Sequence, residues 1–298
     1  MEYSLTGCPC PETILLASGG VRGLSYIGAL EELERAGGLA RLKCWAGVSA
    51  GALTATALAL GYTIREMYDV AVRFDFGVLK NIDETSPLRL FDFYGLDTGE
   101  RMARFVAALF HVRGLVDTLT FAELPGTKEL KIWATNINTS QLECYSRTTT
   151  PTMRVAFALQ ASMCIPVVFD PLRNNDGHLI ADGAILNAFP MNALEPAERA
   201  RTLGLVVHIP PTERIIDSFI EYLKHTIYMA FEYRSNASIE LFRDQVVSID
   251  TAGIAGIDFG IGAEEKRALI NRGAAAMKVF LDRKHGGGSK CIERRNSI

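Results

Sequence analysis

The sequence lacks an excess of either charge. Its 298 residues include 31 lysines and arginines and 34 aspartates and glutamates, which leaves a net charge of −3 at pH 7. Nucleic-acid-binding domains are typically strongly basic, so this balance argues against an electrostatic nucleic-acid binder. The same charge balance argues against strong overall attraction to anionic membranes, although the sequence could still form a local basic patch. Apolar residues make up 48% of the chain, enough for a globular protein with a sizeable core.

Cysteine is sparse, and its spacing fits no metal site. Six cysteines are scattered along the chain, and only Cys8 and Cys10 lie close together. A structural zinc site needs a second close pair of ligands, so we expect no metal. The cysteines are more consistent with reduced thiols in a cytoplasmic protein, several of them buried.

We also expect neither a targeting segment nor a membrane-spanning one. Glu2 and the lack of a basic start followed by an apolar run argue against a signal peptide. Residues 44–64 carry no charge and are long enough to span a bilayer. That run contains three glycines and divides into a strand, a turn and a helix. We therefore interpret it as buried core and expect no transmembrane segment.

Apolar runs and amphipathic segments alternate at the start of the chain. Residues 13–17 form a short, mostly apolar run without alternation, which is typical of a central parallel strand. Residues 24–36 have apolar side chains at helical spacing and end at two glycines. Residues 42–48 and 50–60 repeat the strand and the helix. This order predicts a parallel sheet with crossover helices.

The rest of the chain is predicted from the same patterns. We expect helices at residues 64–76, 98–111 (with a Thr98 cap) and 151–160 (with Pro151 in its first turn), strands at 129–136, 141–146 and 203–209, and an irregular aromatic loop over the site at 81–97. Beyond Pro211 we expect helices at 213–242 and 263–281 around a strand at 245–250. The predicted organisation is an α/β core over residues 12–210, a C-terminal helical extension packed on the same domain over 211–283, and a disordered tail over 284–298.

The first chemical motif is Gly-Val-Ser-Ala-Gly at residues 47–51, between a predicted strand and a predicted helix. It matches the G-x-S-x-G nucleophile elbow, in which a sharp turn exposes the serine hydroxyl, here that of Ser49. Gly47 and Gly51 occupy positions where a Cβ would collide with the neighbouring strand and helix. Small residues before an alanine-rich helix are also common in tight packing, so this motif alone is moderately specific.

The second motif is the glycine-rich turn Ser-Gly-Gly-Val-Arg-Gly at residues 18–23. Such a turn between a strand and a helix presents backbone N–H groups to an anion. A dinucleotide-binding loop fits poorly, because Ser18 occupies the first glycine position of G-x-G-x-x-G, and no P-loop lysine follows. A plain tight turn is another interpretation. With the elbow one βα unit later, we favour an oxyanion hole formed by the amides of Gly19 and Gly20.

The third motif is Asp-Gly-Ala at residues 182–184, directly after an apolar run. An aspartate in this position is more often a turn cap than a base. Together and in this order, however, the three motifs resemble those of the patatin-like phospholipase family, whose members use a Ser-Asp dyad. Arg22 and Gly23 look like the end of the family's oxyanion loop. Gly183 and Ala184 look like the end of its D-G-[GA] signature.

The resemblance extends from about residue 14 to about residue 194 and includes the block Ala-Ser-Met-Cys-Ile-Pro at 161–166. It implies a three-layer α/β sandwich with a mostly parallel central sheet, Ser49 as nucleophile and Asp182 as base. It further implies that the protein is a phospholipase A-like lipid acyl hydrolase, that it acts in lipid degradation, and that it needs no cofactor. Ser18 departs from the family's first glycine, but it is small enough for the loop to form. A free aspartate, with a pKa of about 3.9, is a weak base at neutral pH, so burial would have to raise the pKa of Asp182.

Several alternatives stay open. The substrate could instead be a triacylglycerol or a lysophospholipid. The motifs could belong to a catalytically silent anion-binding or interaction module, in which Ser49 and Asp182 only pack turns. A histidine-based hydrolase is a further rival, because His208 follows in the order Ser, Asp, His. We expect the protein to act peripherally at a membrane or lipid-droplet surface. The apolar stretch at residues 90–94 is either its lipid contact or part of the core.

Overall fold

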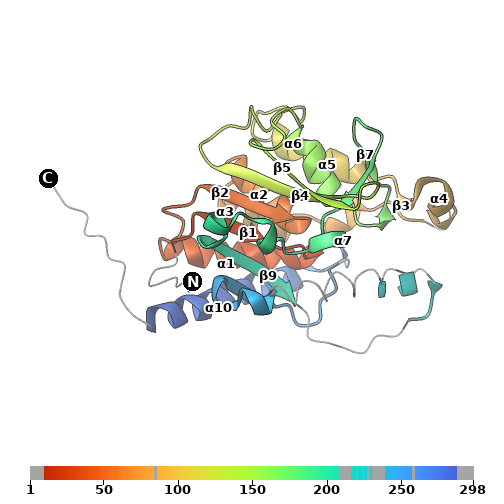
Figure 1. Ribbon diagram of the computed structural model, residues 1–298. Coiled ribbons are helices and arrows are strands. Elements are labelled where there is room, and N and C mark those ends of the chain that lie inside the picture. Colours follow the sequence, from red (N-terminus) through yellow and green to blue (C-terminus); the bar gives the residue numbers. More distant parts are fainter. Residues whose placement is uncertain are drawn as a thin grey trace.

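The computed structural model describes residues 10–83, 86–208, 216–219, 221–223, 225–226, 229, 239–256 and 259–286. Its main sheet contains β1 (Thr13–Leu16), β2 (Cys44–Val48), β4 (Glu129–Asn136), β5 (Gln141–Ser146), β7 (Leu172–Arg173), β8 (Leu179–Asp182), β9 (Thr202–His208) and β10 (Val246–Asp250). Over the described residues the strand order is β10-β9-β1-β2-β4-β8-β7, with β5 also paired to β4 (Figure 1). A separate pair joins β3 (Gly95–Asp97) to β6 (Val167–Phe169).

The sheet is mostly parallel, as predicted. β10, β9, β1, β2 and β4 pair in parallel, whereas β4 pairs antiparallel with β5 and β8, and β8 pairs antiparallel with β7. Every residue of β1 is buried, because helices cover both faces of a central parallel strand. The predicted strands at 129–136 and 141–146 are β4 and β5 and pair as a hairpin.

Alternate side chains of β1 enter two cores. Ile14 and Leu16 belong to the larger core, and Leu15 and Ala17 to the smaller one on the other face. The larger core is covered by α1 (Ser25–Arg35), α2 (Ala50–Ala59), α3 (Ile64–Arg73), α5 (Glu100–His111), α6 (Val155–Ser162) and α10 (Ala263–Gly286). The smaller core is covered by α7 (Ala184–Asn187) and the 3-10 turn η3 (Met191–Ala193). The result is the three-layer sandwich that the sequence predicts.

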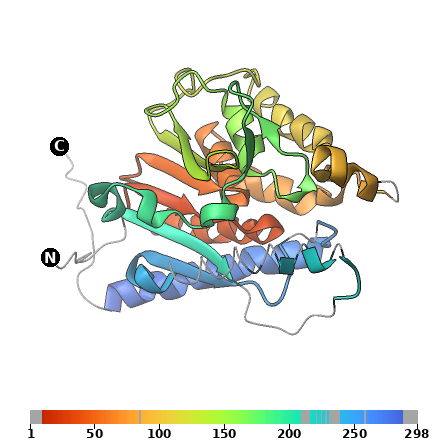
Figure 2. The same ribbon diagram turned by 45° about the vertical axis from the view of Figure 1, so that its right-hand side comes forward.

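Helices α1 and α10 lie side by side beneath the sheet (Figure 2). A Cβ at Gly28 would come within 1.9 Å of the Ile270 carbonyl oxygen, and one at Gly273 within 1.8 Å of the Ser25 carbonyl oxygen. Both glycines are therefore needed for backbone-to-backbone contact between the two helices. This contact joins the end of the described chain to its beginning.

Several predicted boundaries are wrong. Helix α3 ends at Arg73 and is followed by the 3-10 turn η2 (Phe76–Leu79). Helix α6 begins at Val155, so Pro151 precedes the helix rather than lying in its first turn. The supposed irregular loop at 81–97 contains α4 (Ser86–Phe93) and β3. Helix α5 begins at Glu100, with Gly99 at the N-cap position, and the predicted Thr98 cap is present because the Thr98 hydroxyl accepts the Glu100 backbone N–H at 3.2 Å.

The C-terminal third contributes to the same sheet and the same helical layer. The predicted strand at 245–250 is β10, and the predicted helix at 263–281 is α10, which continues to Gly286. Most of the predicted helix at 213–242 and residues 287–298 of the predicted tail lie outside the described residues. The division at residues 210 and 283 stays a prediction.

The uncharged run at residues 44–64 forms β2, the turn at Ser49 and α2, as predicted. In the part of the chain that the structure describes, none of the helices combines the length and the apolar character needed to cross a membrane.

Candidate active site

The two predicted catalytic residues meet on one edge of β4. β5 occupies the other edge, so β2 and β8 share this one in succession. β2 pairs with β4 as far as Val48 opposite Trp133, and β8 takes over at the next position, with Asp182 opposite Ala134. Ser49 directly follows Val48. The register of three strands therefore brings together two residues that are 133 positions apart in the sequence.

Ser49 occupies a strained turn between β2 and α2. Its backbone has φ 55° and ψ −122°, a conformation that costs a non-glycine residue about 1–3 kcal/mol. Close packing keeps the turn in this shape: a Cβ at Gly47 would lie 2.3 Å from the Gly51 backbone, and one at Gly51 would lie 2.1 Å from the Leu16 carbonyl oxygen. The sequence spacing thus produces a nucleophile elbow in three dimensions.

The Ser49 hydroxyl donates a hydrogen bond of 2.6 Å to Oδ2 of Asp182. The other carboxylate oxygen, Oδ1, accepts the backbone N–H of Ala184 at 2.9 Å. Asp182 is only 1% exposed, and burial raises its pKa from 3.8 to about 7, against the smaller lowering effect of these two hydrogen bonds. A carboxylate with a pKa near 7 is a far better base at neutral pH than a free aspartate. The carboxylate therefore has both the position and the basicity to accept the Ser49 proton.

The glycine-rich loop lies beside the elbow because β1 and β2 are neighbouring strands. Gly20 has φ +57°, and a Cβ there would lie 1.9 Å from the Gly256 carbonyl oxygen, so only glycine fits. Among the described residues, the amides of Gly19 and Gly20 have no acceptor, whereas the amide of Val21 donates to Gly256. Two adjacent free donors near Ser49 fit the predicted oxyanion hole.

The residues around the motifs have structural roles. Arg22 is buried and its Nε donates to the Gly19 carbonyl oxygen at 3.1 Å, so it stiffens the loop. A Cβ at Gly23 would meet the Ala50 side chain at 2.9 Å, and one at Gly183 would meet the Trp133 carbonyl oxygen at 2.6 Å. Both glycines thus allow close contact between the loop, the elbow and β4.

Ser162, at the end of α6, is a residue that the sequence reasoning missed. Its hydroxyl accepts the Ser49 backbone N–H at 2.8 Å and donates to the Trp133 carbonyl oxygen at 2.7 Å. Ser162 therefore links the elbow to β4 at the position where the pairing partner of β4 changes from β2 to β8. The sequence feature that points to Ser162 is its position in the block at 161–166, which resembles the corresponding block of the patatin-like phospholipase family.

The structure places His208 away from this pair. It lies at the end of β9, separated from β2 by β1, and its Nδ1 is 3.1 Å from the Ser248 hydroxyl. Within the described residues no group of three or more His, Cys, Asp or Glu side chains could hold a metal ion. Cys44, Cys144 and Cys164 are free thiols, and Cys8 and Cys291 lie outside the described residues.

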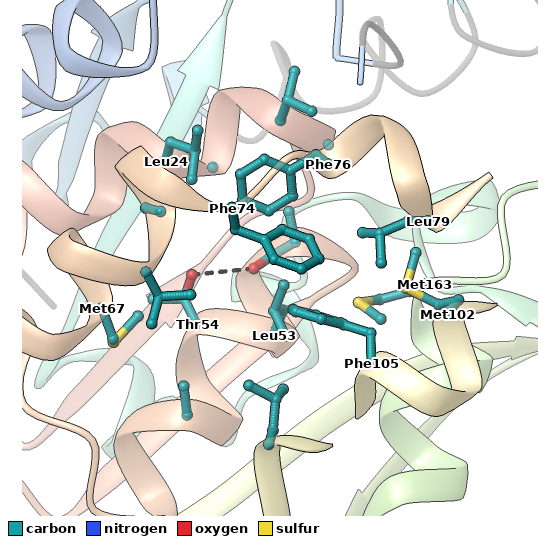
Figure 3. Close-up of a pocket in the computed structure, with 18 of the residues that line it drawn as sticks. Leu24, Leu53, Thr54, Met67, Phe74, Phe76, Leu79, Met102, Phe105 and Met163 are labelled. Atoms are coloured by element: carbon teal, nitrogen blue, oxygen red, sulfur yellow. Dashed lines mark hydrogen bonds between the residues drawn. The ribbon is translucent and has the colours of Figure 1, made fainter. Parts of the chain in front are cut away.

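An apolar cavity of about 340 Å³ has Ser49 among its lining residues. It runs along α2, from which Ser49, Leu53, Thr54 and Ala57 line it, and it continues between α3 and α5. Figure 3 shows aromatic, aliphatic and methionine side chains converging on this space, among them Phe74, Phe76, Phe105, Met102 and Met163. None of the lining side chains is charged. The cavity fits a hydrocarbon chain attached to a group at Ser49.

Residues 14–194 match the patatin-like phospholipase family. Since this match covers more than half of the chain, the protein belongs to that family, as the three motifs together predict.

The chain is also similar to individual proteins and to a solved structure. An uncharacterised protein of Acanthamoeba polyphaga mimivirus is 24% identical over 279 residues, which cover 90% of this chain and 92% of the viral one. A probable lipid hydrolase of Invertebrate iridescent virus 6 is 26% identical over 183 residues, 61% of this chain and 62% of that protein. The crystal structure of VipD from Legionella pneumophila superposes with a TM-score of 0.61 at 19% identity, over 93% of this chain and 68% of VipD. That structural likeness shows a shared fold.

Proposed function

We propose that this protein is a lipid acyl hydrolase that cleaves fatty acyl esters through a dyad of Ser49 and Asp182. The observation that carries the proposal is the 2.6 Å hydrogen bond between these two side chains, with Ser49 in the wall of an apolar cavity. Family membership and the iridescent virus relative, a probable lipid hydrolase, support lipid ester hydrolysis in general.

The geometry supports a two-step reaction. The Ser49 oxygen attacks the ester carbonyl carbon while its proton passes to Oδ2 of Asp182, and the carbonyl oxygen becomes an oxyanion held by the amides of Gly19 and Gly20. When the C–O bond breaks, the leaving alcohol takes the proton from Asp182. Asp182 then removes a proton from water, which attacks the carbonyl carbon of the acyl-Ser49 ester. When the bond to the Ser49 oxygen breaks, Asp182 returns this proton to the Ser49 oxygen, which leaves the fatty acid and the free serine.

The cavity length suggests how the acyl chain lies. Ala57 is eight residues beyond Ser49 on the same face of α2, a distance of about 12 Å at about 1.5 Å per residue. An extended chain advances about 3.5 Å per three bonds, so this stretch holds about ten carbons. We propose phospholipid as the leading substrate, with triacylglycerol and lysophospholipid as the alternatives within the same mechanism.

The test is hydrolysis of a panel of phospholipids, lysophospholipids and triacylglycerols by the wild type, Ser49→Ala and the control Ser248→Ala, whose serine is exposed on β10. The wild type and the control should release fatty acid, and Ser49→Ala should release none while keeping its thermal stability. Full turnover by a folded Ser49→Ala would refute the proposal. The absence of any ester hydrolysis by the wild type would favour the anion-binding module instead.

A further inference from the structure

Helix α4 presents an unusual number of large apolar side chains to solvent. Leu88 is 74% exposed, Phe91 87%, Phe93 52% and the following Tyr94 52%; we call these four residues the α4 surface. Exposed apolar side chains on a monomer are normally scattered, and a concentration of them marks a site of interaction. The question is which partner this surface fits.

The α4 surface belongs to an anchored helix. The Arg89 guanidinium lies 2.6 Å from Oδ2 of Asp170, which follows β6, and also stacks on the ring of Phe93 at 4.6 Å. The chain then enters β3, which pairs with β6. These contacts fix one side of α4 to the protein and leave Leu88 and Phe91 facing outward.

The α4 surface is also anchored next to the cavity that contains Ser49. Phe169, the residue before Asp170, lines the cavity, so the anchor of α4 is next to the cavity wall. The turn η2, which precedes α4, contributes Phe76 and Leu79 to the same wall while Val78 is exposed. In Figure 1, α4 projects at the right of the molecule. The exposed helix is therefore anchored beside the wall of the cavity that contains the nucleophile.

Charge decides the kind of partner. The charged residues of α4 are Arg89 and Asp92, and Arg89 is paired with Asp170, so the three side chains together carry a charge of −1. A surface without excess positive charge and with two exposed phenyl rings suits the interface between headgroups and acyl chains, where aromatic side chains are favoured.

We propose that the α4 surface inserts into the interface of a phospholipid bilayer and so places the Ser49 cavity against its substrate. Leu88 and Phe91, the two most exposed side chains, enter the acyl region, and Phe93 and Tyr94 lie at the headgroup level. This inference rests on the proposed function, because it explains how a water-insoluble ester reaches a buried serine. Adhesion is apolar and therefore depends weakly on salt.

The experiment is co-sedimentation with phosphatidylcholine vesicles, using full-length Ser49→Ala so that the lipid is not consumed. In that background we compare the parent, Leu88→Ser with Phe91→Ser, and the control Val279→Ser, which removes a 58% exposed valine from α10. The double substitution should weaken partitioning at least about tenfold, since each side chain loses its transfer from water to an apolar phase. The control should bind like the parent. Binding should change little between about 0.1 M and about 1 M salt, although the Debye length falls from about 10 Å to about 3 Å.

Three results would overturn the proposal: a parent that does not sediment with the vesicles, a double variant with unchanged thermal stability that sediments like the parent, or binding that high salt abolishes. The second result would move lipid contact to other exposed residues, such as Phe219 and Tyr222. Wild-type hydrolysis of a soluble short-chain ester separates this inference from the proposed function. Vesicle binding through α4 without ester hydrolysis would refute only the function, and hydrolysis without binding through α4 would refute only the lipid contact.

Discussion

Replacing Asp182 with asparagine should make the stability of the protein less dependent on pH. Burial raises the pKa of the Asp182 carboxyl from 3.8 to about 7 in the folded protein, whereas in the unfolded chain it is about 3.9. Between these two values the folded protein binds one more proton than the unfolded chain. The free energy of unfolding therefore falls as the pH rises through this range, and it levels off once the pH exceeds the folded-state pKa.

The size of the effect follows from the two pKa values. One pKa unit corresponds to about 1.4 kcal/mol, so the wild type should lose about 2.5 kcal/mol between about pH 5 and about pH 8 through Asp182 alone. The asparagine of the Asp182→Asn variant cannot titrate and keeps the size of the side chain. Its single oxygen can accept the backbone N–H of Ala184, while its amide NH2 can donate to the Ser49 oxygen. All other titrating groups are shared by the two proteins, so their contributions cancel in the comparison.

The assay is urea unfolding of the wild type and Asp182→Asn at several pH values across this range. The difference in unfolding free energy should move by about 2.5 kcal/mol in favour of the variant as the pH rises. Ser49→Ala removes a hydrogen bond that lowers the pKa of Asp182, so it should shift the levelling-off to higher pH. A difference that stays constant across the range would show that Asp182 titrates alike in both states, and the account of a buried base would be wrong.

Three further predictions concern catalysis. The value of kcat/KM should rise with pH to a plateau above about pH 7 as Asp182 ionises, and a profile that falls through pH 7 would contradict its role as base. Ser162→Ala leaves the Ser49 backbone N–H and the Trp133 carbonyl oxygen without their hydrogen-bond partner, and each unpaired group costs about 1–3 kcal/mol of stability in the elbow. On a soluble ester, kcat should therefore fall about 10- to 100-fold with little change in KM. An unchanged kcat would show that the elbow does not need Ser162. Ala57→Phe fills the cavity about 12 Å from Ser49, so hydrolysis of long-chain esters should fall at least about tenfold relative to short-chain ones, and an equal effect on both would place the acyl chain elsewhere.

Much of the site could be predicted from the sequence because each motif is local. The spacing of Gly47, Ser49 and Gly51 is a consequence of one turn, and a Cβ at Gly47 would collide with the Gly51 backbone within that turn. Likewise, the apolar run of β1 identifies a buried strand without any knowledge of its partners. Such features are determined by short stretches of chain.

Other features depend on contacts that the sequence does not display. Asp182 reaches Ser49 because β8 follows β2 along the edge of β4, a register that no single segment specifies. Ser162 acts through two backbone groups from distant segments, which leave no spacing pattern. Helix α4 was expected to be irregular because its proline and aromatic residues favour turns, whereas the pair between Arg89 and Asp170 and the pairing of β3 with β6 fix it in the fold.

The most direct test of the central claim is labelling with a fluorophosphonate probe, which reacts only with an activated serine, followed by mass spectrometry of the intact protein and its peptides. The wild type should gain one adduct, located on Ser49. Ser49→Ala should gain none, and Asp182→Asn should react far more slowly, because its amide cannot take the serine proton. An adduct on a different serine, or labelling of Asp182→Asn at the wild-type rate, would contradict the Ser49–Asp182 dyad.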